Sequence, residues 1–259
     1  MPHATTSADL TLHYVIDGPD AAPVVVLSNS IGTNVDLWAP IVPRLAEKFR
    51  VVRYDSRGHG GSTTPAGDYT MSQLAGDIAA ILDDLAVERA HVVGLSVGGQ
   101  TALTFALEHP ERLDRLVVSN TGAKIGTEQS WADRAAKVRG EGLEAIVDAV
   151  TAGWLTPSHA AENPEQLATL KEWFLGNDPE GYAATCIALG HTDLNDRLGE
   201  ISAPTLVIGT TGDVPTPPAL TFAIADGIPG ATRVEIPGAH LSVQEAPEAY
   251  AEAVLAHLS

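Results

Sequence analysis

A serine stands between two glycines where the sequence pattern changes, in the segment Gly94-Leu95-Ser96-Val97-Gly98. The residues before it, "HVVGL", are apolar and β-branched, which is typical of a buried strand, whereas "TALTFAL" after it has helical spacing. A sharp strand-to-helix turn strains its central residue and crowds the positions two residues away, where glycine has no Cβ to clash. The pattern therefore predicts Ser96 as a nucleophile held clear of a sheet. The alternative is a glycine-containing turn with an incidental serine.

Serine is a weak nucleophile until a neighbouring base removes its proton, so Ser96 needs a histidine at the same edge of the fold. His240, in "EIPGAHLSVQE", follows the last apolar run and precedes the last stretch of helical spacing. His59, in "YDSRGHGGS", also follows an apolar run and is the competing candidate. We favour His240 as the base because it completes the chain order serine, acid, histidine.

The acid that orients this base should lie between the two residues in the sequence. Asp213, in "PTLVIGTTGDVPTPP", follows an apolar run and stands in a proline-bounded loop, where its carboxylate could accept the Nδ1–H of His240. An aspartate that only caps its own turn is the alternative reading of Asp213. Asp55 and Asn120, which also follow apolar runs, are the substitute candidates for the orienting group.

Attack on an acyl carbon also requires hydrogen-bond donors for the oxyanion that forms. We expect one donor to be the backbone N–H of Val97, directly after the nucleophile, and the other to be that of Ile31 in "VVVLSNSIGTNVDLW". Because both donors are backbone groups, we expect the side chains of this loop to matter only for its shape.

Short apolar runs alternate along the chain with stretches of helical spacing. Several runs are apolar throughout, which is typical of parallel strands covered on both faces, whereas residues 10–18 alternate and predict an antiparallel edge strand. The expected fold is α/β, a mostly parallel central sheet with helices on both faces. The predicted strands lie at residues 10–16, 23–28, 49–55, 90–95, 115–120, 204–209 and 232–237, and the predicted helices of the sheet layers at 35–48, 72–85, 97–109, 218–226 and 247–257.

Residues 123–195 interrupt this alternation, because they contain amphipathic stretches and no convincing strand. Trp131, Trp154 and Trp173, three of the four tryptophans of the chain, lie in this region. Helices inserted between two parallel strands would lie above the C-terminal edge of the sheet, where such folds keep their sites. We therefore predict a helical lid at residues 123–195 on a core formed by residues 1–122 and 196–259.

The composition limits the compartment and the partners that we expect. A chain of 259 residues can form one large core, its N-terminus shows no signal-peptide pattern, and no apolar run approaches membrane-spanning length. The lone cysteine, Cys186, cannot form an internal disulfide, which favours a reducing cytoplasm. A net charge of −18 argues against nucleic acid and anionic membranes, so we expect a small-molecule substrate. The sequence gives no indication of an oligomeric state.

Several segments, taken in order along the chain, resemble the α/β-hydrolase fold over nearly its whole length. Within that fold the sequence most resembles the 3-oxoadipate enol-lactonases, which have a segment similar to "LSNSIGTNVDLW" where most relatives carry a His-Gly motif. The segments that carry this resemblance are "SNSIG", "YDSRGHGGS", "GLSVGG", "WADRAAKVRGEG", "EGYAATC", "GTTGDVPTP" and "GAHLS".

The resemblance implies a nucleophile, an acid and a base at Ser96, Asp213 and His240, with oxyanion donors at Ile31 and Val97. It implies hydrolysis of 3-oxoadipate enol-lactone to 3-oxoadipate through an acyl-enzyme. We expect no metal and no organic cofactor. The sequence departs from the family at "GTTGDVP", which holds one residue more before the aspartate than the usual Gly-x-x-Asp spacing.

The carboxylate of such a substrate needs a cationic partner. Arg134 is our candidate, with Lys137 and Arg139 nearby on the same predicted helix, and Trp131 or Trp154 could form a wall beside the lactone ring. A solvated basic helix face is the alternative reading of these charges.

Other activities are compatible with the same catalytic groups. Carboxylesterases that act on neutral esters and hydrolases that cleave C–C bonds use them too, and the motifs do not separate these substrates. A ligand sensor on a hydrolase fold, with slow turnover or none, is the alternative of a different class.

Overall fold

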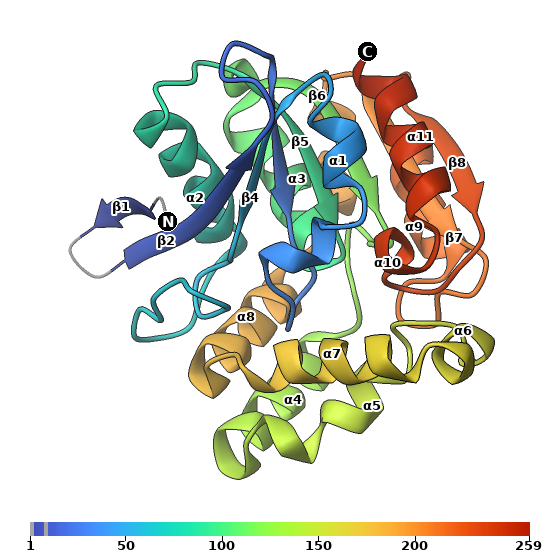
Figure 1. Cartoon of the computed structure of the whole chain (residues 1–259). Coiled ribbons are helices and arrows are strands. Elements are labelled where there is room, and N and C mark those ends of the chain that lie inside the picture. The colour runs from blue at the N-terminus through green and yellow to red at the C-terminus, as the bar shows by residue number, and fades with distance from the viewer. Residues whose placement is uncertain (1–2, 8–9) are drawn as a thin grey trace.

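The computed structural model describes residues 3–7 and 10–259, which form a sheet of eight strands in the order β1-β2-β4-β3-β5-β6-β7-β8 (Figure 1). The pairs β1–β2 and β2–β4 are antiparallel, and the other neighbours are parallel. The predicted α/β fold with a mostly parallel sheet is confirmed. The strands are β1 (His3–Ser7), β2 (Leu10–Asp17), β3 (Val24–Ser28), β4 (Arg50–Tyr54), β5 (Ala90–Leu95), β6 (Leu113–Ser119), β7 (Thr205–Thr210) and β8 (Thr232–Ile236).

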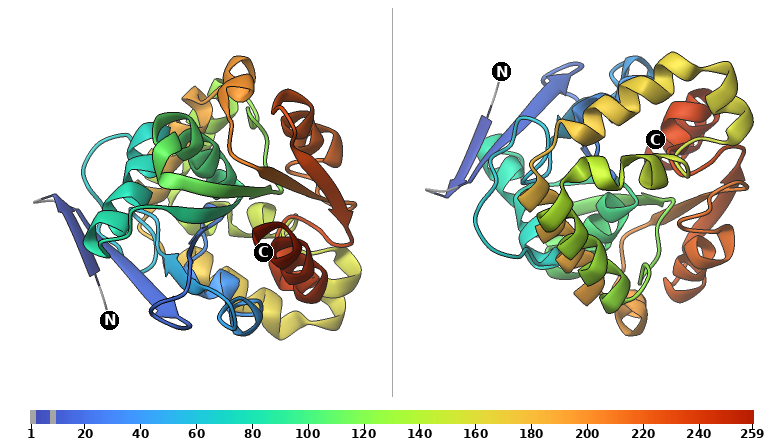
Figure 2. Two further views of the ribbon diagram at one scale, coloured as in Figure 1. Left: turned by 90° about the horizontal axis from the view of Figure 1, so that it is seen from above. Right: turned by 90° about the horizontal axis from the view of Figure 1, so that it is seen from below.

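The inner strands are rich in buried apolar residues because both of their faces are covered. In β3, Val25 and Leu27 belong to one hydrophobic cluster, whereas Val24 and Val26 belong to another on the opposite face. Helices α2 (Met71–Asp84), α3 (Val97–Glu108) and α9 (Pro218–Gly227) cover one face, and α1 (Val42–Leu45) and α11 (Pro247–Leu258) cover the other (Figure 2).

Two expectations about the N-terminal third were wrong in detail. Strand β2 is antiparallel to β4 as predicted, but it is not an edge strand, because β1 pairs with its outer side. The helix predicted over residues 35–48 is broken into the 3₁₀-helix η1 (Val35–Trp38) and the short α1. Pro40 lies between the two pieces, and proline has no N–H to donate to a continuous helix.

A group of helices follows β6 and precedes β7, in the region where the sequence shows no strand. We call residues 123–195 the helical insertion; it lies below the sheet in Figure 1, and α4 packs against α8. Its division from the rest of the chain as a separate lid stays a prediction. Its helices are α4 (Glu128–Glu141), α5 (Val147–Thr151), α6 (Pro157–Glu162), α7 (Pro164–Leu175) and α8 (Pro179–His191). Among the described residues, no helix has the length and apolar character needed to cross a membrane.

The turn from β5 into α3 has the strained geometry that its glycines predict. Ser96 has φ 61° and ψ −120°, a conformation that residues with a side chain rarely adopt. A Cβ on Gly94 would lie 2.1 Å from the carbonyl oxygen of Gly98, and one on Gly98 would lie 2.1 Å from that of Ser28. The two glycines therefore allow the helix to begin directly against two strands.

Replacement of Gly94 by alanine tests this close approach. We expect Gly94→Ala to lower the free energy of unfolding by about 3 kcal/mol or more, because the backbone must move to accept the methyl group. Gly76→Ala in α2 is the matched control, since a Cβ there meets nothing within 4 Å. The control should gain about 0.5–1 kcal/mol, as alanine does over glycine inside a helix. Equal effects in urea unfolding would contradict the explanation.

Candidate active site

Ser96 is held from behind by the end of the neighbouring strand β6. Its backbone N–H donates to the carbonyl oxygen of Ser119 at 3.0 Å, and the Thr121 hydroxyl donates to its carbonyl oxygen at 2.7 Å. Helix α3 begins at Val97, so its first N–H groups have no partner inside the helix and are free to bind an anion beside the Ser96 hydroxyl.

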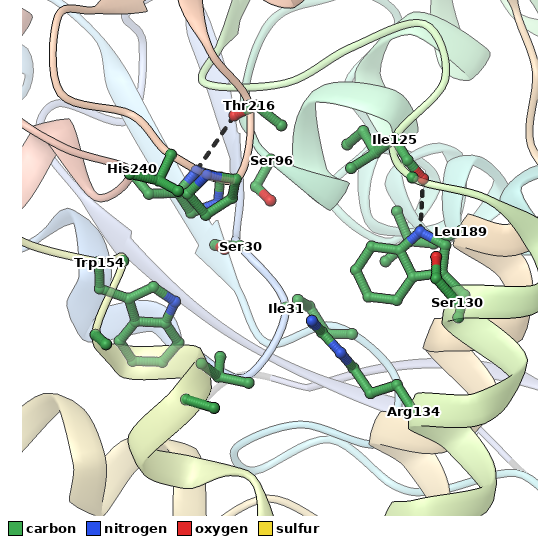
Figure 3. A pocket seen from close by; sticks show the side chains of 18 residues that line it. Ser30, Ile31, Ser96, Ile125, Ser130, Arg134, Trp154, Leu189, Thr216 and His240 are labelled. Atoms are coloured by element: carbon green, nitrogen blue, oxygen red, sulfur yellow. Dashed lines mark hydrogen bonds between the residues drawn. The ribbon is translucent and has the colours of Figure 1, made fainter.

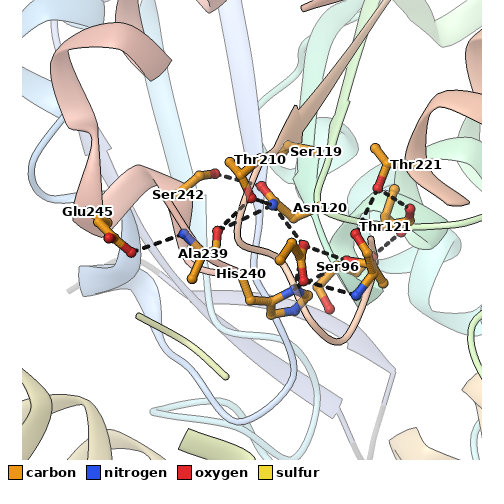
Figure 4. A network of polar contacts seen from close by, with 12 residues as sticks. Ser96, Ser119, Asn120, Thr121, Thr210, Thr221, Ala239, His240, Ser242 and Glu245 are labelled. Carbon is orange, nitrogen blue, oxygen red and sulfur yellow. Dashed lines mark hydrogen bonds and ion pairs between the residues drawn. The ribbon is translucent and has the colours of Figure 1, made fainter. Parts of the chain in front are cut away.

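Asp213 follows β7 and His240 follows β8, and Figure 4 shows His240 beside Ser96. The Nδ1 atom of His240 lies 3.1 Å from each carboxylate oxygen of Asp213. Because an ionised carboxylate can only accept, Nδ1 carries the proton and leaves Nε2 as the basic atom. Ser96 and His240 line the same cavity, so the structure brings together the three residues predicted as nucleophile, acid and base.

The Asp213 carboxylate is buried and receives donors on both oxygens. Besides His240, the Thr216 N–H donates at 2.9 Å, and its hydroxyl donates at 2.7 Å. Burial by itself raises the pKa of the Asp213 carboxyl, but the charge and hydrogen bond of His240 and the Thr216 donors outweigh it, so the pKa lies below its usual range. Sequence reasoning missed Thr216, although Asp-x-x-Thr spacing is a signal for a side chain that caps a turn.

The loop that carries Asp213 pairs with the segment that follows β8. The N–H of Thr211 donates to the carbonyl of Ile236 at 3.3 Å, and that of Gly212 donates to Gly238 at 2.9 Å. The loop after β7 therefore runs beside the loop that carries His240, and this pairing places Asp213 opposite the imidazole.

Asn120 was a substitute candidate for the group that orients the base, and it contacts the acid instead. It is fully buried with φ 47°, and its side-chain amide donates to Asp213 Oδ2 at 2.8 Å and to the Thr210 hydroxyl at 2.7 Å. Its own oxygen accepts a hydrogen bond from Ser242 at 2.6 Å. Asn120 thus connects the ends of β6 and β7 to the loop of His240.

The other candidates are occupied elsewhere. Asp55 pairs with His13 at 2.7 Å and accepts the N–H groups of Val35 and Gly61, so it braces the loops after β3 and β4. His59 does not line the cavity; its Nδ1 lies 3.1 Å from the Arg57 carbonyl, and burial lowers its pKa.

A cavity of about 450 Å³ opens between the sheet edge and the helical insertion (Figure 3). Its walls combine the predicted catalytic groups with apolar side chains of the insertion, such as Leu189 and Val150. The predicted residues that line it are Ser96, His240, Ile31, Trp131, Trp154 and Arg134. Val97 is buried at the start of α3 and is not one of the residues that line the cavity.

Arg134 is distinguished from the neighbouring basic residues by its lack of an acidic partner. It extends from α4 into the cavity toward Ile31 (Figure 3), and its guanidinium carbon lies 4.6 Å from the Trp131 ring centroid. Within residues 3–7 and 10–259 it forms no ion pair. Lys137 instead pairs with Glu141, and Arg139 is held by the surface carboxylates of Asp68 and Glu180.

The helical insertion is hydrogen-bonded to the loops that carry the predicted catalytic groups. The side-chain amide of Asn177 donates to the Gly32 carbonyl at 3.0 Å, next to Ile31. At the other side of the cavity, the Leu241 N–H donates to the Trp154 carbonyl at 2.9 Å. A Cβ on Gly32, whose φ is 81°, would lie 2.6 Å from Phe174, so α7 packs directly on the loop after β3.

The lowered pKa of Asp213 gives a test of its charge. A group that binds its proton more weakly in the folded state stabilises the fold above its unfolded pKa of about 3.9, and that stabilisation is lost as the pH falls through the folded value. In urea unfolding from pH 7 to below pH 4, wild type should exceed Asp213→Asn at neutral pH, and the difference should shrink in acid. The exposed-site variant Asp20→Asn controls for net charge. A difference independent of pH would contradict an ionised, stabilising carboxylate.

Comparison with known proteins places this geometry in a family. The family model for the alpha/beta hydrolase fold matches residues 23–247. The chain is 37% identical to 3-oxoadipate enol-lactonase 2 of Acinetobacter baylyi, covering 96% of this chain and 93% of the relative. It is 34% identical to the provisionally named carbamate hydrolase RutD of Caulobacter sp. (strain K31), covering 98% and 97% of the two chains.

A solved structure agrees with these sequence relatives. The enol-lactonase from Burkholderia xenovorans LB400 is 41% identical, with a TM-score of 0.96 and 99% of both chains covered. The predicted resemblance to enol-lactonases and their fold is thereby confirmed. The chain therefore belongs to the α/β-hydrolase family.

Proposed function

We propose that this hydrolase opens a small anionic enol-lactone, converting 3-oxoadipate enol-lactone to 3-oxoadipate through an acyl-enzyme on Ser96. The observation that carries the proposal is that Arg134 lies in the same cavity as Ser96 and His240 and has no ion-pair partner in the described part of the chain. The similarity to two enol-lactonases supports the choice of substrate.

In the first step, His240 Nε2 accepts the proton of Ser96, and the Ser96 oxygen attacks the lactone carbonyl carbon. The carbonyl oxygen becomes an oxyanion that accepts the backbone N–H groups of Ile31 and Val97. Asp213 stays ionised, holds the imidazole in the required tautomer and stabilises the imidazolium that forms.

Collapse of the tetrahedral intermediate breaks the bond between the acyl carbon and the ring oxygen. The leaving group is an enolate, so it needs little protonation to depart, and it remains tethered to the acyl-enzyme. It ketonises by taking up the proton that His240 received from Ser96, which leaves the imidazole neutral again. His240 then takes a proton from water, the hydroxide attacks the ester carbon, and the proton returns to Ser96 as the free carboxylate forms.

Arg134 supplies the charge that the substrate carboxylate requires. The protein has a net charge of −18, so an anion is repelled unless a local cation binds it. A planar guanidinium can hold a carboxylate with two parallel hydrogen bonds, and the adjacent Trp131 ring keeps it in place by stacking. The apolar remainder of the cavity suits the lactone ring.

Hydrolysis of both a lactone and a neutral ester by purified protein tests this function. We expect 3-oxoadipate enol-lactone to be turned over with a far higher kcat/KM than p-nitrophenyl acetate, and Ser96→Ala to lower kcat for both by about 10⁴-fold or more. Ester turnover with an inert lactone would keep the nucleophile and reject the substrate. A carbamate in the same panel tests for the activity named for the RutD relative. If no compound is turned over, the alternative of a ligand sensor on a hydrolase fold is favoured.

The carboxylate-binding role of Arg134 gives a separate prediction. Arg134→Gln should lower kcat/KM for the enol-lactone about 10–100-fold, mostly through KM, because a charge-assisted hydrogen-bonded pair is lost. The neutral ester should change by less than about twofold. Lys137→Gln, one turn along α4 and paired with Glu141, is the matched control and should leave both substrates unaffected. Equal losses on lactone and ester in Arg134→Gln would refute the role.

A further inference from the structure

Three consecutive polar residues follow the apolar part of β3, and their side chains differ in their hydrogen bonding. The Ser28 hydroxyl lies 2.8 Å from that of Tyr54. The Asn29 side chain donates to the Tyr54 carbonyl at 2.8 Å and accepts from the Trp38 indole at 2.7 Å. The Ser30 hydroxyl is buried and has no hydrogen-bond partner among the residues that the structure describes.

Ser30 is also the member of this segment that lines the cavity. It is 2% exposed and directly precedes Ile31, and Figure 3 shows it beside Ser96 and His240. Its carbonyl oxygen accepts both the N–H and the hydroxyl of Thr33, at 3.2 and 2.8 Å. The backbone of Ser30 is therefore fixed in a turn, whereas its hydroxyl forms no hydrogen bond with the described residues.

The other hydroxyls of the cavity wall, apart from that of Ser96, have partners. Ser130 donates to the Thr127 carbonyl at 2.9 Å, and Thr216 donates to Asp213 at 2.7 Å. A buried hydroxyl without a partner costs free energy, and such groups in native proteins call for an explanation such as a catalytic role. A hydrogen-bond acceptor that is present only when substrate is bound would explain why the Ser30 hydroxyl is buried without a partner.

We propose that the Ser30 hydroxyl is a third donor to the oxyanion, in addition to the backbone N–H groups of Ile31 and Val97. The proposal rests on the proposed serine-hydrolase function and deepens it. The hydroxyl proton stays on Ser30 throughout; it is hydrogen-bonded more strongly to the full negative charge of the tetrahedral intermediate than to the ground-state carbonyl. Such a contact lowers the barrier without tightening substrate binding. It also means that a side chain of this loop takes part in the chemistry.

Ser30→Ala separates catalysis from structure, because it removes the donor and keeps the Cβ. We expect kcat to fall at least tenfold, toward the about 10²–10³-fold typical for loss of one oxyanion donor, with KM changed by less than about twofold. The melting temperature should stay equal or rise, since no hydrogen bond within the protein is lost. A structural hydroxyl would give the opposite pattern, a lower melting temperature with kcat preserved.

The matched control is Thr104→Val in α3. The Thr104 hydroxyl is likewise buried and has no partner within residues 3–7 and 10–259, but it does not line the cavity. Its removal should leave kcat and KM unchanged and the melting temperature equal or higher. A fall in kcat as large as that in Ser30→Ala would show that loss of any such hydroxyl disturbs the enzyme, and would overturn the proposal.

Pre-steady-state kinetics with p-nitrophenyl acetate identify the step. Acylation and deacylation both pass through an oxyanion at the same place, so Ser30→Ala should slow both by similar factors. Slowing of deacylation alone would mean that Ser30 positions the hydrolytic water, and the proposal would be wrong. A trifluoromethyl ketone, which forms a tetrahedral anion on Ser96, should bind Ser30→Ala more weakly by about the factor lost in kcat/KM; unchanged binding would also overturn it.

Failure of this inference can be told from failure of the proposed function. If Ser96→Ala abolishes turnover while Ser30→Ala behaves like wild type, only the third donor is lost. If Ser96→Ala retains turnover, the acyl-enzyme mechanism itself is wrong.

Discussion

The left-handed backbone of Ser96 is the constraint on which the site depends. A residue with a side chain reaches φ 61° at a cost in free energy, and it stays there only if its surroundings leave no alternative. Gly94 and Gly98 allow the backbone segments around Ser96 to approach closely, and Ser119 and Thr121 form hydrogen bonds with the Ser96 backbone. Gly94 belongs to β5 and Ser119 to β6, and Gly98 in α3 packs on Ser28 of β3, so the order of the parallel strands makes the turn possible.

The buried carboxylate of Asp213 is a second group whose burial costs free energy that other contacts must offset. Its charge would be strongly disfavoured at this depth without donors, and the loops after three strands provide them: Asn120 after β6, Thr216 after β7 and His240 after β8. The same bonds that keep the carboxylate ionised also fix its direction. The hydrogen bonds that stabilise the buried charge of Asp213 therefore also orient the imidazole of His240.

Much of this arrangement could be predicted because it depends on patterns of residues that are adjacent in the sequence. Apolar runs bounded by turn residues mark the strands, and Ser96 is marked by its glycines. The partners that complete the site were harder to find, because their roles arise from contacts distant in the chain. Asn120 reaches Asp213 across 93 positions. Helix α8 is buried at most of its positions, so it lacks the amphipathic period that reveals a surface helix.

The bonds from the helical insertion to the loops beneath it have an evolutionary consequence. Asn177 holds Gly32, Phe174 packs on the same glycine, and the Trp154 carbonyl holds the loop of His240. A substitution that shifts one of these anchors therefore also shifts the loop that carries Ile31 or the loop that carries His240. Adaptation to a different substrate must preserve these anchors, so the changes it can tolerate are confined to wall positions that carry none of them, such as Val150 and Leu189.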